Sequence, residues 1–192
     1  VKKFIHVSAI GASKDSKSKY QQSKFLGEEK ALSNFDKTVI IRPSVVIGNE
    51  DNFTNLFAKL ILSPIIHVVN VNYKFEPIFV NDVARAILKA IETKNNEGKI
   101  YELGGGRVIS FGDMIKLILS TIGKKRIVAD VPMTLAKIQS SLLSILPIDP
   151  IITKDQCLIL SEKDNVVSGD HLTLKDLNLS LIHISEPTRP RS

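Results

Sequence analysis

Short apolar runs alternate along this chain with segments that have the periodicity of helices. The apolar runs predict strands at residues 3–8, 38–41, 99–102 and 126–129, with a further extended piece near 68–79. The segments between them predict helices at about 17–33, 52–62, 82–92 and 111–122. Because strands that alternate with helices usually pair in the same direction, this order predicts an α/β fold built on a parallel sheet.

Two of the predicted helices carry a start signal. Asn81 is the expected N-cap of helix 82–92, and Ser110 with Asp113 is expected to form a capping box at the start of helix 111–122. The core face of helix 82–92 is predicted from its apolar spacing to consist of Val83, Ile87, Leu88 and Ile91.

The predicted helix 17–33 carries Tyr20 and Lys24, four residues apart. Positions i and i+4 lie one above the other on a helix, so the phenol and the ammonium converge on one small volume. A nearby ammonium favours phenolate, and we expect Lys24 to lower the pKa of Tyr20 from its ordinary value near ~10. Such a pair suits proton transfer in redox chemistry on a nicotinamide, with Ser8 supplying a hydroxyl to orient a substrate.

The Tyr and Lys spacing also arises by chance, since the chain holds 20 lysines and three tyrosines. The order of the surrounding segments favours a functional site. An apolar strand ends at Ser8, the Tyr20 helix follows, and the next strand runs into Arg42, Pro43 and Ser44. Ligands of open parallel sheets bind at the carboxyl ends of the strands, where Ser8 and Pro43 are expected to lie.

These segments resemble the second half of an extended or atypical short-chain dehydrogenase/reductase, the group that includes nucleotide-sugar epimerases and dehydratases. Within it, the chain is most similar to the NAD(P)-binding family of alpha-subcomplex subunit 9 of respiratory complex I and its bacterial relatives. The matching segments lie at residues 4–9, 19–24, 26–28, 42–44, 48–53, 77–83 and 151–155.

The resemblance implies roles for individual residues. Tyr20 would be the acid/base, Lys24 would bind the nicotinamide ribose, and Ser8 would orient the substrate. The implied contacts to NAD or NADP come from Val7, Tyr20, Lys24, Pro43, Ser44, Val45 and Val46.

The resemblance also implies the domain organisation. The expected fold class is the C-terminal part of a Rossmann-like doubly wound parallel sheet plus a small α/β substrate or docking region. Residues 1–92 would be the remnant of the NAD(P)-binding domain, and 93–178 the C-terminal region. We expect the glycine-rich phosphate-binding turn of such domains to be missing, because Gly104-Gly105-Gly106 has the wrong spacing and is typical of a plain turn.

The last residues, 179–192, resemble the in-frame translation of a sequencing adapter. They are expected to be a non-native tail that contributes no designed contact, so the chain is expected to be a gene fragment. A natural tail ending in Pro-Thr-Arg-Pro-Arg-Ser is the alternative.

Composition and charge restrict the class of protein further. The net charge is +6, but 20 lysines against 6 arginines, scattered along the chain, favour a solvated surface over a nucleic-acid interface. The single cysteine, Cys157, lies among apolar residues and is expected to be buried. The four histidines lack metal-ligand spacing, so no metal site is expected. His6, between apolar neighbours, is expected to be structural.

Neither a signal peptide nor a membrane span is evident, so a cytoplasmic location is expected, with the periphery of the inner membrane as the alternative. The apolar segment 132–147 is too short to cross a bilayer. It is expected either to form a buried helix that closes a substrate cleft or to dock on partner subunits or the membrane surface.

Two functions stay open from the sequence. One is a subunit that binds NAD(P) structurally and supports a quinone-reducing respiratory complex. The other is an NAD(P)-dependent epimerase, dehydratase or reductase that uses Tyr20 and Lys24 in turnover. The segments Pro147–Thr153 and Leu174–Leu177 favour the complex I family.

Overall fold

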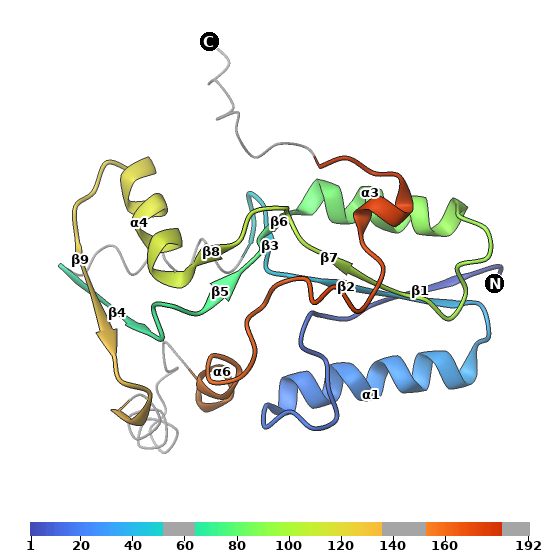
Figure 1. The fold of residues 1–192 in the computed structure, drawn as a ribbon, viewed down its shortest axis with the longest axis horizontal. Helices are drawn as coiled ribbons and strands as arrows, with labels where there is room; N and C mark the ends of the chain where they lie inside the picture. The colour runs from blue at the N-terminus through green and yellow to red at the C-terminus, as the bar shows by residue number, and fades with distance from the viewer. Residues whose placement is uncertain (52–63, 136–152, 182–192) are drawn as a thin grey trace, which may run out of the picture.

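A computed structural model describes residues 1–51, 64–135 and 153–181 of the chain (Figure 1). The helices are α1 (Lys19–Asn34), α3 (Val80–Glu92), α4 (Phe111–Thr121), α6 (Lys154–Ile159) and the 3-10 helix η1 (Leu174–Leu177). The strands are β1 (Phe4–Val7), β2 (Thr38–Pro43), β3 (Val46–Ile47), β4 (Ile65–Val69), β5 (Lys74–Phe75), β6 (Ile78–Phe79), β7 (Ile100–Leu103), β8 (Ile109–Ser110) and β9 (Ile127–Val131).

The first sheet has the order β1-β2-β7, and both pairings are parallel. All six residues of β2 are buried, because this strand is flanked on both sides. Helices α1 and α3 cover opposite faces of the sheet (Figure 1). This arrangement confirms the predicted Rossmann-like α/β fold with parallel strands.

The start of α3 differs from the prediction. The N-cap is Phe79, which makes no side-chain capping bond, and Asn81 lies inside the first turn. The reason is that β6 runs straight into the helix, which leaves no loop in which Asn81 could cap. At the start of α4, Ser110 is the N-cap as predicted, since its hydroxyl accepts a hydrogen bond from the Asp113 backbone N–H, but the predicted capping box is not formed because the Asp113 carboxylate accepts from the Ser110 hydroxyl instead of its N–H.

The buried face of α3 is also shifted from the predicted one. Val83 is buried and Ile87 packs against the core, but Leu88 and Ile91 are 62% and 50% exposed. The face that meets the sheet instead carries Ala86 and Ala90, both fully buried. Small side chains there let the helix backbone approach the strands closely, which the apolar periodicity alone did not indicate.

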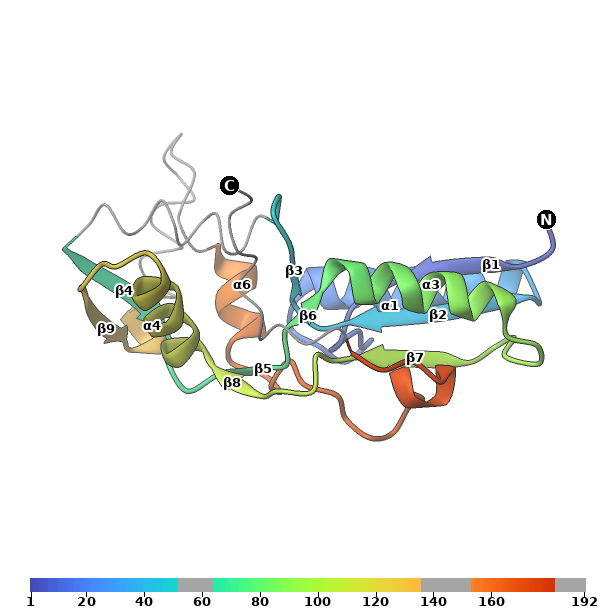
Figure 2. The same cartoon turned by 90° about the horizontal axis from the view of Figure 1, so that it is seen from above.

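The second half of the molecule is built on two small sheets. Strands β4 and β9 pair in parallel, and β5 pairs antiparallel with β8. Their core joins α4 and α6, and it includes the predicted buried residue Cys157, which is fully shielded from solvent. Figure 2 shows these elements beside the first sheet rather than above it.

Strands that precede residue 92 pair with strands that follow it. Strand β7 extends the first sheet, whereas β4 and β5 lie in the second half and pair with β9 and β8. The predicted boundary at residue 92 therefore lies between strands that share a sheet. Of the other predicted elements, helix 52–62 and residues 136–147 of the apolar segment lie outside the described residues, as does the tail from residue 182.

Residues 179–181 make contacts that the sequence did not predict. Leu179 and Leu181 pack against the core of the first half, and the Ser180 carbonyl accepts a hydrogen bond from Arg85 at 3.1 Å. These three residues therefore continue the packing on the first half beyond η1. Burying a leucine side chain against an apolar surface is favourable wherever the chain passes close to such a surface.

Candidate functional site

Ser8 and the predicted Pro43–Val46 loop lie at the carboxyl edge of the first sheet. The Ser8 N–H donates to the Ile41 carbonyl at 2.7 Å, and the Ser44 N–H donates to the Leu103 carbonyl at 2.9 Å. The ends of β1, β2 and β7 are thereby aligned, and the loops that follow β1 and β2 leave the sheet side by side. This edge is where parallel sheets bind ligands.

Two buried side-chain atoms, the Ser8 hydroxyl and His6 Nε2, have no hydrogen-bond partner among the described residues, and of these only Ser8 lies at the strand end. Ser8 is 4% exposed, and its Oγ has no hydrogen-bond partner among the described residues. An unsatisfied buried polar group costs about 1–3 kcal/mol, so an unpaired hydroxyl at this edge fits a site that a ligand completes. The predicted role of Ser8 as an orienting hydroxyl is compatible with this geometry.

Tyr20 and Lys24 lie on one face of α1, as their spacing predicts. Lys24 Nζ is 5.7 Å from the centroid of the Tyr20 ring, a cation–π distance. The expected effect on acidity is wrong, however. Partial burial of the half-exposed Tyr20 ring raises the pKa of the phenol, since desolvation disfavours phenolate. Tyr20 therefore holds its proton at neutral pH and is available as a hydrogen-bond donor.

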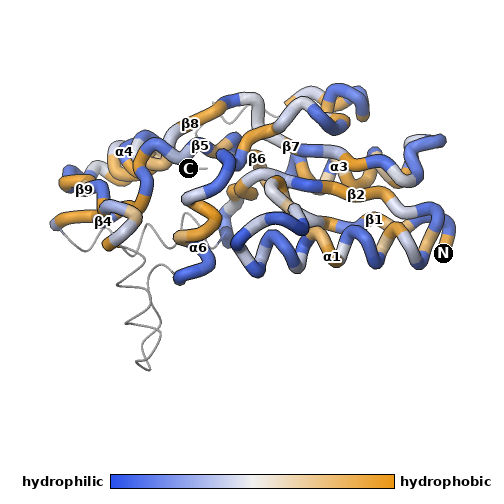
Figure 3. The backbone as a smooth tube through the Cα atoms, turned by 60° about the horizontal axis from the view of Figure 1, so that its bottom comes forward, coloured by the Kyte–Doolittle hydropathy of each residue, from blue (hydrophilic) through white to orange (hydrophobic). Residues whose placement is uncertain are grey.

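Helix α1 is held in place mainly by polar contacts. Only Gln21 and Glu28 are buried along it, and Figure 3 shows hydrophilic residues over most of its length. Glu28 forms a two-point ion pair with Arg42, with bonds of 2.8 Å from Nε and 2.6 Å from Nη2. His171 and Glu102 also lie within 3.1 and 3.8 Å of Arg42 Nη1. This buried network fixes the Tyr20 helix to β2.

The amino end of α1 is capped by a residue from α6. Asp155 accepts hydrogen bonds from the Ser18 hydroxyl at 2.7 Å, the Lys19 N–H at 2.7 Å and the Tyr20 N–H at 3.2 Å. Burial opposes ionisation of Asp155, but these three hydrogen bonds outweigh it and hold the pKa of the carboxyl below its ordinary value. Glu162 adds bonds to the Ser16 hydroxyl and the Lys17 N–H.

The loop after β2 is fixed by a residue far along the chain. Ser44 and Val45 both donate hydrogen bonds to Asn165, and the Val45 carbonyl accepts one from the Ile78 N–H at 2.9 Å. Val46 then enters β3, where it pairs with Ile78. The predicted cofactor loop, Pro43–Val46, is therefore ordered by its neighbours on both sides.

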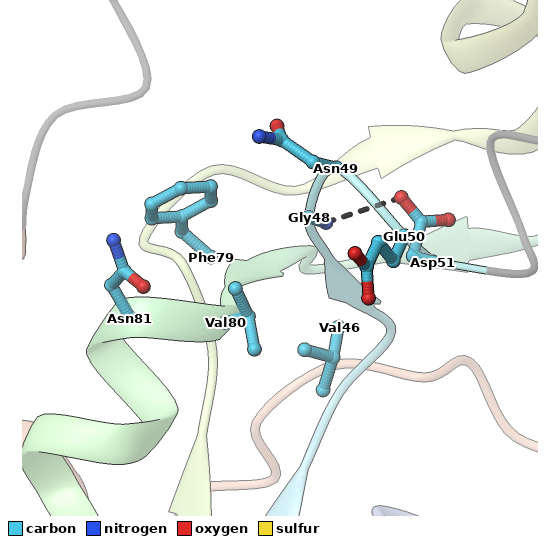
Figure 4. Close-up of a pocket in the computed structure, with 8 residues that line it drawn as sticks. All are labelled: Val46, Gly48, Asn49, Glu50, Asp51, Phe79, Val80 and Asn81. Atoms are coloured by element: carbon cyan, nitrogen blue, oxygen red, sulfur yellow. Dashed lines mark hydrogen bonds between the residues drawn. The ribbon is translucent and has the colours of Figure 1, made fainter.

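A cavity of about 590 Å³ opens at the end of this loop (Figure 4). Phe79 and Asn81 lie on its α3 side, and Glu50 and Asp51 lie on its β3 side. The described residues that line it are Val46, Gly48, Asn49, Glu50, Asp51, Phe79, Val80 and Asn81. An aromatic ring, amides and carboxylates around one space offer both stacking and hydrogen-bonding groups to a polar ligand.

Gly48 makes the wall of this cavity possible. A Cβ at residue 48 would lie 2.9 Å from Val80 Cγ1, so glycine lets the end of β3 approach the start of α3 without displacing the Val80 side chain. The Gly48 N–H donates to Asp51 Oδ2 at 3.1 Å, which closes the turn at the cavity rim (Figure 4).

The Gly104-Gly105-Gly106 segment forms a turn packed on residues 76 and 77. Glu76 accepts hydrogen bonds from the Gly105 N–H through its carbonyl and from the Gly106 N–H through Oε1. A side chain at residue 105 would collide with the Pro77 carbonyl. The glycines therefore serve close packing. Among the described residues, no group of three or more His, Cys, Asp or Glu is placed to hold a metal ion.

The structure joins some of the predicted site residues and leaves others apart. It pairs Tyr20 with Lys24 and places Ser8 and Pro43–Val46 at one sheet edge, but no hydrogen bond links Ser8 to Tyr20 among the described residues. His6 packs its ring against Gly27 and lies on β1 rather than at the strand end.

Sequence reasoning assigned no role to Asp155, Glu162 or Asn165. The Thr153-Lys154-Asp155-Gln156 pattern does signal a helix start, and the structure shows the capping box between Thr153 and Gln156. That signal locates α6, but it does not indicate what α6 touches. The contacts with α1 span more than 130 residues of sequence, so only the tertiary structure shows them.

Comparison with known proteins identifies the family. Residues 12–145 match the family described as the RmlD substrate binding domain. The chain belongs to this family. The matched region of the RmlD family covers Tyr20, Lys24 and the Ser44 loop, whereas Ser8 and Asn165 lie outside it.

The relatives by sequence confirm the predicted resemblance to a complex I subunit family. NADH dehydrogenase (ubiquinone) 1 alpha subcomplex subunit 9, mitochondrial, from Dictyostelium discoideum is 33% identical over 97% of this chain and 53% of its own length. The protein of the same name from Mus musculus is 31% identical over 93% of this chain and 48% of its own length. The chain thus spans about half the length of these curated relatives.

Solved structures agree on the fold. A dTDP-4-dehydrorhamnose reductase from Bacillus anthracis, crystallised in complex with NADP, superposes with a TM-score of 0.58 at 19% identity. The match covers 81% of this chain and 63% of the reductase. At this level of identity the likeness supports the Rossmann-like fold of the RmlD family. In the described part of the chain, no helix combines the length and the apolarity that crossing a bilayer requires.

Proposed function

We propose that the protein containing this chain binds NAD or NADP and acts as a subunit that supports the assembly or stability of an NADH:quinone oxidoreductase. The observation that carries the proposal is the similarity to mitochondrial subunit 9 proteins, which extends over 93–97% of the chain. Their names place these relatives in a mitochondrial respiratory complex, so the proposed location is at such a complex rather than free in the cytoplasm.

The residues at the sheet edge fit a nicotinamide dinucleotide. Ser8 presents an unpaired buried hydroxyl, Lys24 presents an ammonium and Tyr20 presents a protonated phenol. Val7 and Pro43–Val46 supply backbone at the ends of β1 and β2. A bound nicotinamide would supply hydride chemistry, and these residues would bind and orient it whether or not turnover follows.

A calorimetric titration of the complete gene product with NADH and NADPH tests cofactor binding. Lys24→Ala is expected to weaken the binding by about 1.5–3 kcal/mol, the range for hydrogen bonds to a charged group. Lys30→Ala is the matched control, because Lys30 is an exposed lysine further along the same helix. Equal affinity in the Lys24 and Lys30 variants would contradict the assignment.

The cavity beside Val46 favours a second candidate, an NAD(P)-dependent epimerase, dehydratase or reductase. Its amide, carboxylate and aromatic lining suits a substrate rich in hydroxyl groups, such as a sugar nucleotide. The raised pKa of Tyr20 suits proton donation better than proton abstraction. Turnover of a hydroxyl or carbonyl substrate that disappears in Tyr20→Phe would support this candidate over the structural subunit.

A further inference from the structure

Asn165 is anchored rigidly by its own backbone. Its N–H donates to the Lys74 carbonyl at 2.9 Å, and its carbonyl accepts from the Glu76 N–H at 3.0 Å. These bonds pair it with β5 like a short parallel strand. The side chain therefore projects from a fixed point between the two halves of the molecule.

The Asn165 side chain reaches the loops that follow both β1 and β2. Oδ1 accepts hydrogen bonds from the Ser44 hydroxyl at 2.6 Å and from the Val45 N–H at 3.2 Å. Nδ2 donates to the Ile10 carbonyl at 3.4 Å. The amide orientation is chemically determined, because reversing it would place the NH2 group against the Val45 N–H and the oxygen against the Ile10 carbonyl.

The loops that Asn165 connects carry the proposed cofactor contacts. Ile10 lies two residues after Ser8, and Ser44 and Val45 belong to the predicted Pro43–Val46 loop. Ile10 and Ser44 are each 5% exposed, so water does not substitute for the amide at these positions. Together with the Ile10 N–H, which donates to the Pro43 carbonyl at 3.1 Å, this side chain holds the loop after Ser8 beside the loop after β2.

We propose that Asn165 is a positioning residue that holds the two loops at the spacing needed to bind the nicotinamide end of NAD(P). The inference rests on the proposed cofactor binding for its ligand. It adds a residue outside the matched RmlD region, and one that contacts the two loops rather than the cofactor itself.

A purely structural role is the competing explanation, since Asn165 also belongs to the segment that joins the two halves. Tyr73 separates the two roles, because its hydroxyl donates to the Lys163 carbonyl at 3.0 Å and, among the described residues, forms no hydrogen bond with either loop. Tyr73→Phe removes one hydrogen bond that docks the same segment, so it is a matched control for docking alone.

The first test measures NADH affinity by calorimetry on the complete gene product. Asn165→Ala is expected to weaken binding about tenfold, because the Val45 N–H and the Ile10 carbonyl lose their partner and the Ser44 hydroxyl keeps only the backbone carbonyl of residue 165. Asn165→Asp keeps an acceptor for Ser44 and Val45 but has no donor for the Ile10 carbonyl, so it is expected to recover only part of the affinity. Tyr73→Phe should leave the affinity unchanged. Equal weakening by Asn165→Ala and Tyr73→Phe, or full recovery in Asn165→Asp, would overturn the proposal.

The second test needs no cofactor. Hydrogen exchange of the backbone amides should accelerate at residues 10 and 44–46 in Asn165→Ala, and stay unchanged there in Tyr73→Phe. If the wild-type protein binds neither NADH nor NADPH, the proposed function fails and exchange alone decides whether Asn165 orders the loops. Unchanged exchange at these residues would overturn the positioning role. If Asn165→Ala does not fold, the Asn165→Asp variant carries both measurements.

Discussion

At the scale of single residues, Tyr20 shows how burial and a neighbouring charge compete. The Lys24 ammonium lies over the ring face, 5.7 Å from its centroid, and partial burial still raises the pKa of the phenol. A cation over the ring attracts the π electrons in either protonation state, so it favours phenolate less than a direct bond to the oxygen would. The site is therefore suited to hold a proton at Tyr20.

The ionisation of Tyr20 can be isolated by an ultraviolet difference titration of wild type against Tyr20→Phe. We expect no tyrosinate signal from Tyr20 up to about pH 9, and a midpoint above the ordinary value near ~10, because burial disfavours the charged form. Subtraction removes the signals of Tyr73 and Tyr101, whose phenols are also buried. A midpoint near neutrality would restore the view that Lys24 activates the phenol.

At the scale of elements, α1 is a helix without a strong apolar face. Its position depends on the Glu28–Arg42 ion pair in the middle and on Asp155 at the amino end. A carboxylate at a helix N-terminus satisfies free N–H groups and interacts favourably with the helix dipole. Because Asp155 comes from α6, the capping bonds also dock α6 onto α1.

Asp155→Ala is expected to lower the free energy of unfolding by about 1 kcal/mol at pH 7, the usual cost of losing a cap. The folded-state pKa of Asp155 is lowered, so its contribution is complete above the unfolded pKa and is lost as pH falls through the folded value. The deficit measured by urea unfolding should therefore shrink when the pH is reduced from 7 to about 3.

The control for this measurement is Asp170→Ala. Asp170 is an exposed aspartate in the same C-terminal segment, and its carboxylate makes no hydrogen bond among the described residues. Its removal should change the free energy of unfolding by less than about 0.5 kcal/mol, as at ordinary surface sites. Similar losses of unfolding free energy in both variants would show that Asp155 stabilises the protein only through its negative charge and not through its capping hydrogen bonds.

At the scale of the whole molecule, the segment from residue 153 to 178 joins the two halves. Asp155 and Glu162 contact the start of α1, Asn165 contacts the loops at the sheet edge, and η1 packs against the core of the first half. Figures 1 and 2 both show α6 between the two halves. This segment gives the candidate site a wall that its own sheet does not provide.

Strand β1 pairs on one side only among the described residues, and Phe4 on this edge is 43% exposed. An unpaired apolar edge recruits other strands, so we expect the 192-residue chain expressed alone to self-associate. Phe4→Lys should reduce this association in light scattering, because a charged residue blocks edge pairing. Leu88→Lys, which removes an exposed leucine from α3, should not. The opposite order would indicate association through α3.

The local sequence by itself located most of the longer elements and proposed the candidate site residues. Apolar runs and helical periodicity located β1, α1, β2, β7, α4 and β9 within a few residues, since these patterns reflect which side of each element faces the core. The i, i+4 spacing placed Lys24 over Tyr20, because helix geometry alone brings such residues together. The strand order placed Ser8 and Pro43 at one sheet edge.

The tertiary structure decided the features that depend on distant contacts. The acidity of Tyr20, the shifted face of α3 and the pairing of β7 with β2 all follow from what packs against each element. Asp155 and Asn165 reach residues more than 110 positions earlier, and nothing in their local sequence encodes that distance. Local patterns report solvent exposure along one element, whereas a site assembled from several loops is set by how the whole chain packs.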